Sequence, residues 1–351
     1  MNCSDSVRYP FLHGPQPPIS LKARPDLLSW MSDGTFALVA PVVAYWVFSL
    51  FFHVIDTFKL LEKYRIHPPE EIASKNHASR LNVLAEVIFQ HLLQTVVGFW
   101  FNRWDGHPVT GFEKREMWNW RRNVPGVVPD VLVVWAYRYG LSFVKLTLGF
   151  MFIDTWQYWL HYLMHANRRL YKMFHSVHHR LYVPYAYGAL YNAPMEGLIL
   201  DTLGTGLAMV LTGLTHREEL VLFTFATLKT VDDHCGYAIP ADPFQWFFPN
   251  NAVYHDIHHQ TFGMNYNFAQ PFFTFWDSLV NTQYPDFQAY SKQQRRISID
   301  KYKEFLAKRE QEKREKIAKL KDANAFIKDK TDAVASGVAA HVTAQVASVT
   351  A

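Results

Sequence analysis

The chain has 351 residues, which is enough for one large domain or two modest ones. Its net charge of +4 is too small to indicate a nucleic-acid-binding surface. Two cysteines, Cys3 and Cys235, exclude both a disulfide framework and a zinc site built from thiolates. Seventeen histidines and an aromatic content of 16% are the unusual features, and the placement of the histidines decides the interpretation.

The N-terminal lead-in, residues 1–34, has five prolines among its first 25 residues and no continuous apolar stretch of the kind found in a signal peptide. We expect this segment to be disordered or to lie at a membrane interface. The first apolar run covers residues 36–55, a length that fits one crossing of the hydrocarbon core by a helix.

The next two apolar runs predict further spans. In residues 83–101, polar side chains recur at helical spacing, so one face should pack inside a bundle: Glu86, Gln90, His91 and Gln94. Residues 131–160 predict one long helix that leaves the membrane near its C-terminal end, although three charged residues interrupt it: Arg138, Lys145 and Asp154. The spans before the first histidine motif number two or three, which leaves the side of the N-terminus open.

Two shorter apolar runs, residues 197–214 and 220–228, are each marginal for a full span. Together they predict a membrane hairpin or a re-entrant pair. Residues 292–330 carry 14 Lys/Arg against 7 Asp/Glu, which indicates a solvated helix or a flexible tail on the cytosolic side.

The predicted fold is therefore all-α: a polytopic membrane helical bundle, capped on its cytosolic face by the histidine-rich segments. We divide the chain into an N-terminal lead-in (residues 1–34), a membrane-embedded domain (residues 35–290) and a charged cytosolic tail (residues 291–351). Since the chain lacks an internal repeat, a dinucleotide-binding glycine motif and a P-loop, nucleotide-binding classes are not indicated.

Nine histidines form four groups along the chain: His161 and His165; His175, His178 and His179; His234; and His255, His258 and His259. Spacings of three and four residues place side chains on one helical face, so each motif is expected to present its imidazoles in one direction. Imidazole binds zinc, copper, iron and nickel. Nine histidines are too many for one closed zinc site but suit two ions with open positions.

The chain between the motifs supports one shared site. A hairpin or re-entrant pair between His179 and His234 returns the chain to the membrane face that it left, so all four groups can meet there. A metal transporter or a non-catalytic metal-binding membrane protein is the alternative class. Transport would need ligands strung along a pathway, whereas these motifs cluster at helix ends.

The motifs and their surroundings resemble the sphinganine 4-hydroxylases of the fatty acid hydroxylase/sterol desaturase superfamily. The similarity covers roughly residues 31–310 and is carried by MSDGTFALVAPVVAYWVFSLFFHVIDTF, FIDTWQYWLHYLMH, LYKMFHSVHHRLYVPYAYGALYN, TVDDHCGYAIPADPFQWFFPNNAVYHDIHHQ and NFAQPFFTFWDSL. Sterol desaturases, methyl sterol oxidases and fatty-acid 2-hydroxylases share the histidine motifs. The residues around the last motif, DPFQWFFPNNAVYHDIHH, argue against them.

This resemblance implies a di-iron monooxygenase of the endoplasmic reticulum membrane that uses O2 to hydroxylate carbon 4 of sphinganine or dihydroceramide. The nine histidines above would be the ligands of two iron ions. Electrons would come from NAD(P)H through a reductase and cytochrome b5. Because the nearest match to the haem motif of a fused cytochrome b5 is His67-Pro68-Pro69-Glu70, the donor should be a separate chain.

Acidic residues in apolar runs are functional candidates. Asp154 lies seven residues before His161, on the same helical face, and Gln157 joins them. We expect Asp154 to support a ligand imidazole, directly or through Gln157, without binding metal itself. An ion pair with Lys145 or Arg138 is the alternative.

Asp201 is a further acidic residue in an apolar run, and Asn192 and Glu196 are candidates to line the entrance to the site. Helix capping or an interhelical hydrogen bond is the alternative for these residues. The eight histidines outside the motifs are expected to be structural or to lie at the surface: His13, His53, His67, His77, His91, His107, His216 and His341.

Overall fold

The computed structural model describes residues 8–349, and it describes the side chains of residues 8–297, 299–304 and 306–322. It separates into two compact units, Met1–Gln294 and Arg295–Ala351. Helices predominate in the described residues, with a single two-stranded antiparallel sheet, which confirms the all-α prediction.

Four helical stretches are long and apolar enough to cross a membrane. They are α2 (Asp33–Phe58), α4 (Arg80–Asn102), the continuous stretch α6 (Asp130–Trp135), η3 (Ala136–Gly140) and α7 (Leu141–Ala166), and the stretch α9 (Pro194–Gly197), η7 (Leu198–Leu203) and α10 (Gly204–Thr212). Large apolar side chains on their outer faces are exposed, as expected for surfaces that contact lipid.

The stretch Asp130–Ala166 has 37 residues, so it is about 55 Å long, whereas the hydrocarbon core is about 30 Å thick. Both of its ends must therefore project beyond the hydrocarbon. The first two histidines of the motifs lie at its C-terminal end, as the sequence predicted.

A helical hairpin is present at the predicted place, as α9–η7–α10 followed by α11 (His216–Asp233), which packs along α2 and returns towards the histidines. Of its two arms, the first is among the stretches that could cross a membrane and α11 is not. The turn between them is made by Gly213 in the left-handed conformation (φ 63°), and Thr215 caps α11 by accepting from Glu218 N. Gly204 allows α10 to approach α7 closely, because a Cβ there would collide with the Trp156 ring.

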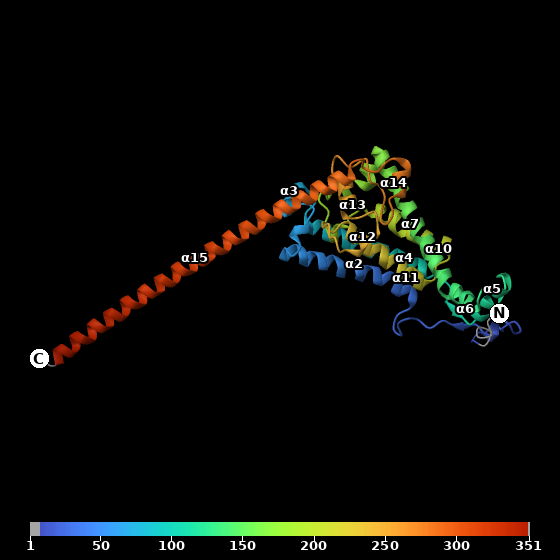
Figure 1. Cartoon of the computed structure of the whole chain (residues 1–351), viewed down its shortest axis with the longest axis horizontal. Helices are drawn as coiled ribbons and strands as arrows, with labels where there is room; N and C mark the ends of the chain where they lie inside the picture. Colours follow the sequence, from blue (N-terminus) through green and yellow to red (C-terminus); the bar gives the residue numbers. More distant parts are fainter. Residues whose placement is uncertain (1–7, 350–351) are drawn as a thin grey trace. The chain divides into compact units, whose positions relative to one another are not determined.

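Short elements and one long helix, α15 (Phe287–Val349), complete the described part of the chain. Before α7 they are η1 (Pro10–Leu12), β1 (Lys22–Ala23), η2 (Glu62–Tyr64), α3 (Pro69–Lys75), β2 (Val109–Thr110) and α5 (Glu113–Asn123). After it they are α8 (Arg168–Leu170), η4 (Tyr171–His175), η5 (His178–Arg180), η6 (Ala186–Gly188), α12 (Pro243–Phe247), α13 (Ala252–His259) and α14 (Phe275–Val280). In the first unit, α13 and α14 lie at one end of the bundle and α5 and α6 at the other (Figure 1).

The N-terminal lead-in differs from the expectation that it is disordered. Strand β1 pairs with β2, the Trp118 indole donates to Gly14 O (3.0 Å) and Arg115 donates to Pro17 O (3.0 Å). Because α5 satisfies these carbonyl groups, described residues 8–32 are ordered and the disordered alternative is not supported.

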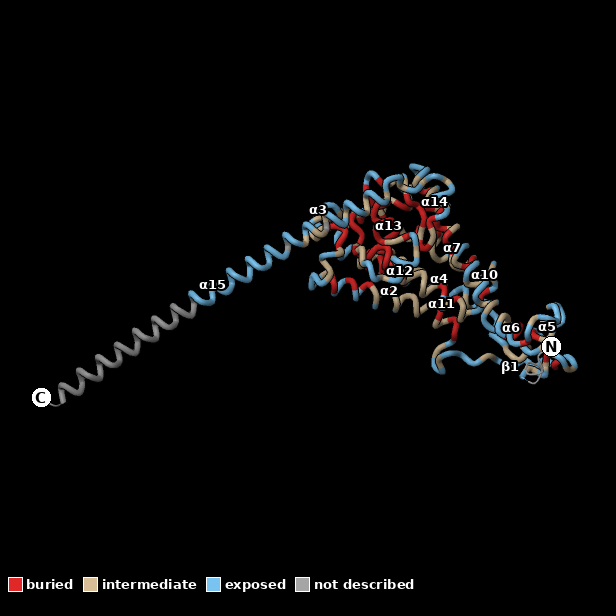
Figure 2. The backbone as a smooth tube through the Cα atoms, in the orientation of Figure 1, coloured by how far each residue is buried: buried red, intermediate tan, exposed pale blue. Residues whose placement is uncertain are grey.

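Buried residues concentrate around α13 and α14 and are sparser along the spans (Figure 2). Part of that core is polar, and it includes most of the motif histidines together with Asp154, Glu196 and Lys229. Buried polar groups need hydrogen-bond or metal partners, so the candidate functional site lies at this end of the bundle.

Candidate metal centre

Four separate chain segments bring the nine histidines to one place. Asn167 accepts from Arg169 N (2.9 Å) and Leu170 N (3.3 Å), which caps α8 and turns the chain back beside α7. Asn251 caps α13 in the same way, with 3.1 Å to both Val253 N and Tyr254 N. The histidines are carried by α7 (His161, His165), by η4 (His175), by η5 (His178, His179), by the residue after α11 (His234), and by α13 (His255, His258, His259).

The nine imidazoles form two groups, in each of which the potential ligand nitrogens all lie within 4.8 Å of one another. The five-histidine group contains His161, His165, His175, His179 and His258. The four-histidine group contains His178, His234, His255 and His259. Each group has enough nitrogens for one ion, as imidazole sites require.

The expectation that each motif points in one direction is confirmed for His161 and His165 but is wrong for the two three-histidine motifs. His255 and His259 belong to one group, and His258 between them belongs to the other. On a helix with 3.6 residues per turn, residues three and four positions after His255 point about 100° apart. The motif His175, His178 and His179 is divided in the same manner, so each three-histidine motif supplies both groups.

The hydrogen bonds of the rings show that both groups suit a cation. A carbonyl oxygen only accepts, so the Nδ1 atoms that face carbonyl groups carry the ring protons. His161 Nδ1 donates to Phe268 O (2.8 Å), and His175 Nδ1 lies 2.5 Å from the Glu196 carboxylate. The Nε2 lone pairs of these two rings therefore face each other at 2.9 Å, a repulsive contact that a shared cation would relieve.

The four-histidine group repeats this arrangement. His178 Nδ1 donates to Tyr191 O (3.3 Å) and His234 Nδ1 to Thr230 O (2.8 Å), and their Nε2 atoms are 3.4 Å apart. Two nitrogens bound at right angles to one ion, each at about 2.1 Å, lie about 3 Å apart. The spacing of the rings is thus that of a ligand set.

Burial favours the neutral, ligating form of these rings. It lowers the pKa of His178 to about 4 and that of His234 to about 3, and for His234 the neighbouring His178 adds to the effect. Both rings are therefore neutral at pH 7. A metal ion does not have to displace a ring proton there before it binds.

Glu196 lies inside the centre and not at its entrance, where the sequence analysis placed it. Its carboxylate holds His175 and also accepts from Ala193 N (3.3 Å), so it caps α9 as well. A carboxylate behind a ligand imidazole fixes the tautomer and raises the basicity of the ring. Asn192 lines a small cavity beside the histidines. The signal for Glu196 in the sequence was an acidic residue at the start of an apolar run.

Asp154 acts on a loop, and the hydrogen bonds that the structure describes for it include no histidine. Its carboxylate accepts from Phe272 N (2.8 Å) and Phe273 N (3.2 Å). The same loop supplies Phe268 O, the acceptor for His161. Lys145 instead donates to Gly213 O (2.7 Å), and Gln157 donates to Asp201 (3.2 Å). Asp154 therefore contacts the loop behind His161, which is less direct than the expected contact with a ligand imidazole or through Gln157.

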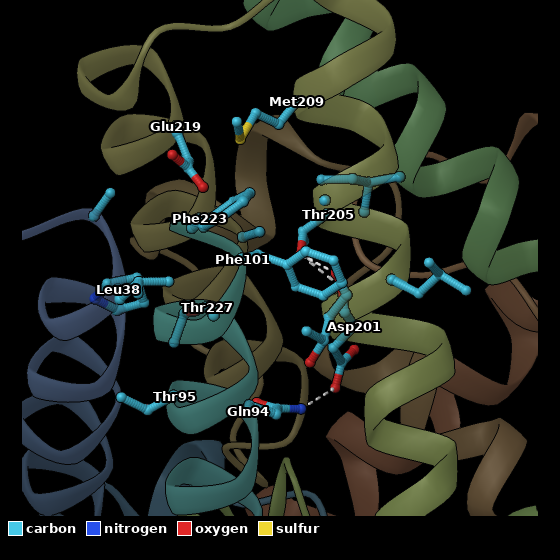
Figure 3. A pocket seen from close by; sticks show the side chains of 18 of the residues that line it. Leu38, Gln94, Thr95, Phe101, Asp201, Thr205, Met209, Glu219, Phe223 and Thr227 are labelled. Atoms are coloured by element: carbon cyan, nitrogen blue, oxygen red, sulfur yellow. Dashed lines mark hydrogen bonds between the residues drawn. The ribbon is translucent and has the colours of Figure 1, made fainter. Parts of the chain in front are cut away.

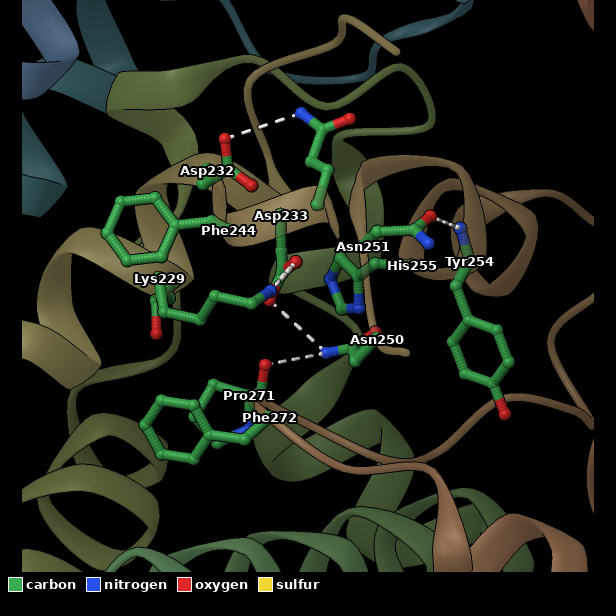
Figure 4. A network of polar contacts seen from close by, with 12 residues as sticks. Lys229, Asp232, Asp233, Phe244, Asn250, Asn251, Tyr254, His255, Pro271 and Phe272 are labelled. Carbon is green, nitrogen blue, oxygen red and sulfur yellow. Dashed lines mark hydrogen bonds and ion pairs between the residues drawn. The ribbon is translucent and has the colours of Figure 1, made fainter. Parts of the chain in front are cut away.

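A buried network beside His255 was missed by the sequence analysis (Figure 4). Lys229, with no exposed surface, forms an ion pair with Asp233, and Asn250 donates to Asp233 (3.2 Å) and to Pro271 O (3.1 Å). This network joins the end of α11 to the loop that Asp154 holds. A lysine in an apolar helix, four residues before an aspartate, was the signal that could have revealed it.

A small cavity adjoins the motif histidines, and a larger one meets it. The smaller, of about 30 Å³, is lined by members of both groups, among them His175, His178, His234 and His255. The larger, of about 430 Å³, is mostly apolar and lies among α2, α4, α7, α10 and α11. Because the two cavities share lining residues, the histidine groups lie beyond one end of a space suited to a long apolar molecule.

Comparison with known proteins agrees with this geometry. The family model for fatty acid hydroxylases matches residues 146–282, a range that contains all nine histidines. No solved structure matches the chain. The chain is 62% identical to the sphingolipid C4-hydroxylase of Saccharomyces cerevisiae, over 90% of both chains.

It is also 40% identical to sphinganine C4-monooxygenase 2 of Arabidopsis thaliana, over 73% of this chain and 90% of that one. A very-long-chain aldehyde decarbonylase of Oryza sativa is 38% identical over 73% of this chain and 91% of its own. These matches confirm the resemblance found in the sequence. The chain belongs to the sphingolipid C4-hydroxylase family of oxidoreductases.

Proposed function

We propose that this protein is a membrane monooxygenase that hydroxylates carbon 4 of sphinganine or dihydroceramide to give phytosphingosine-type products. The observation that carries the proposal is the pair of histidine groups at the end of a mostly apolar cavity. The names of the relatives at 62% and 40% identity support this substrate class over the aldehyde named for the relative at 38%.

The fatty acid hydroxylase family is iron-dependent. We propose two iron ions, one in the five-histidine group and one in the four-histidine group. When bound, they supply the activation of O2 that cleavage of an unactivated C–H bond requires. The overall reaction consumes O2, two electrons and two protons, and it yields the hydroxylated lipid and water.

The protein's own residues restrict where the reaction occurs. Backbone carbonyl groups fix the orientation of imidazoles in both groups, and the buried Glu196 carboxylate fixes that of His175. The small cavity, at about 30 Å³, has room for about two water-sized groups. Only a short part of a lipid chain can therefore lie against the histidines, which favours attack at one carbon.

We further propose that electrons reach the site from NAD(P)H through a reductase and a separate cytochrome b5. The basic segment after residue 292 supports a cytosolic position for the histidine end and the C-terminal tail. The endoplasmic reticulum membrane is the proposed location.

The division of the chain into lead-in, membrane domain and tail, at residues 34 and 290, stays a prediction. Asp154 is proposed to support the centre through the loop of Phe268, Phe272 and Phe273.

Purified protein, reconstituted with iron, a reductase and cytochrome b5, tests the proposal. Sphinganine, NADH and heavy-isotope O2 should give 4-hydroxysphinganine with one labelled oxygen at carbon 4. Metal analysis should find about two iron ions per chain, one for each group of imidazoles. Dominant hydroxylation of an acyl chain, a new double bond in a sterol, or full activity with one ion would contradict it. In a deletion strain, selective loss of 4-hydroxylated bases would separate the enzyme from a transporter.

A further inference from the structure

We infer that Asp201 binds the head group of the substrate and selects a free sphingoid base by accepting hydrogen bonds from its ammonium group. The inference rests on the proposed function and adds to it a residue that positions the substrate. It also distinguishes two chemical forms of substrate, the cationic base and its neutral N-acylated form.

Asp201 lies where the two cavities meet. Five residues line both the large and the small cavity: Gln157, Leu190, Asp201, Thr230 and Pro271. Asp201 and Thr230 supply the two groups of this set that can bind a hydroxyl or an ammonium group strongly. Figure 3 shows the Asp201 carboxylate among the side chains that line the large cavity, beside Gln94.

No described side chain places a positive charge against this carboxylate. Its described hydrogen bonds come from two neutral amides, Gln94 Nε2 (3.4 Å) and Gln157 Nε2 (3.2 Å). None of the ion pairs found among the described side chains includes it. A carboxylate in an apolar space is costly without a cationic partner, and an ammonium group that enters the cavity would provide one.

Local structure holds this carboxylate in place. Asp201 lies on η7, a π-helical turn, and such widened turns occur frequently at functional sites. Gln94 also donates to Gly197 O (3.2 Å), one turn before Asp201, which fixes α4 against η7. The two amides therefore orient the carboxylate and leave it available from the cavity.

Distance decides which end of the cavity takes the head group. In a sphingoid base, three bonds separate the nitrogen from carbon 4, a span of less than about 4 Å. The ammonium group must therefore lie close to the histidines. Asp201 meets this requirement because it lines the small cavity together with histidines of both groups. Its partner Gln157 is four residues before His161, about 6 Å along α7.

The two other carboxylates that line the large cavity, Asp105 and Glu219, do not meet it. Asp105 lies 3.8 Å from the ring of His216, at the start of α11 and therefore away from its histidine end. Glu219 lies eleven residues before Thr230 on α11, about 16 Å from the histidine end, and it pairs with His216 (3.0 Å). A head group bound there would leave carbon 4 far from the metal centre. The roughly 18 Å of apolar chain beyond carbon 4 in an 18-carbon base instead runs from Asp201 along the large cavity towards Glu219.

The test compares sphinganine with N-acetylsphinganine, whose nitrogen is neutral, in the reconstituted full-length enzyme. In Asp201→Asn, which removes the charge but keeps the shape, kcat/KM for sphinganine should fall at least about 10-fold relative to that for N-acetylsphinganine. The product should also spread to carbons next to carbon 4, because the head group is no longer anchored. Glu219→Gln is the matched control, and it should change both substrates by the same factor.

A purely structural role for Asp201 predicts equal losses for the two substrates and hydroxylation at carbon 4 alone, and that result overturns the inference. If Asp201→Asn does not fold, Asp201→Glu moves the charge by one methylene and should shift the position of hydroxylation; unchanged regiochemistry would then count against it. The proposed function fails separately, when the unmodified enzyme forms no 4-hydroxylated product.

Discussion

The two histidine groups have the same type of ligand but different supports. In the four-histidine group every ring is buried, and three of the four Nδ1 atoms face backbone carbonyls: Tyr191 O, Thr230 O and Leu181 O. The fourth, His255 Nδ1, has no hydrogen-bond partner among the described residues. In the five-histidine group His165 and His179 are only half-buried, and His175 is held by the Glu196 carboxylate. The main chain thus orients the first group, whereas the second also depends on a side-chain charge. A single substitution at a supporting side chain should therefore weaken the five-histidine group without weakening the four-histidine group.

The largest effect is expected from two ligands on the same helix. His255→Ala removes a nitrogen from the four-histidine group, and His258→Ala removes one from the five-histidine group. Each should lower turnover by more than about 100-fold, which exceeds the usual cost of losing an outer partner. Each should also lower iron from about two ions per chain to about one, because the other group keeps its own ligands. Product analysis and metal quantification check this, and the loss of both ions in either variant would show that the groups are not independent.

Glu196→Gln should be the next most severe change. It keeps the size of the side chain but removes the charge behind His175, so iron affinity or turnover should fall by about 10- to 100-fold. Glu71→Gln is a matched control, because it alters the same kind of contact, at 2.9 Å, on His67, which belongs to neither group. If both substitutions lowered iron affinity or turnover equally, the dependence of the five-histidine group on the Glu196 charge would be contradicted.

Asp154→Asn should have a smaller effect. The charge that holds Phe272 N and Phe273 N is lost, which loosens the loop behind His161, so turnover should fall about 10-fold while iron is retained weakly. Lys145→Met and Arg138→Met serve as comparisons. Near-normal turnover and iron content in Asp154→Asn, together with poor folding of either comparison variant, would favour the ion-pair alternative.

The smallest effects are expected outside both groups. His107 is exposed, and His341 lies outside the residues whose side chains the structure describes. His107→Ala and His341→Ala should change turnover less than about twofold, as is usual for substitutions away from a site. Loss of iron in either variant would mean that the ligand set extends beyond nine histidines.

The sequence was sufficient to predict which histidines come together but not how they are shared. Spacing predicted that His255, His258 and His259 would lie on one helix, and they do. Their division depends on the rings that surround α13, which are set by tertiary packing. The same limit applies to Asp154: its helical face was correct, but its partners come from residues 272 and 273, more than a hundred positions away.

The large cavity lies among helices that are apolar enough to cross a membrane, and this has a kinetic consequence. A lipid substrate that dissolves in the bilayer reaches these helices by lateral diffusion. The concentration that governs the rate is then the mole fraction of substrate in the membrane. Diluting the bilayer with inert phospholipid should slow the reaction, whereas adding buffer at a fixed amount of membrane should leave the occupancy of the cavity unchanged.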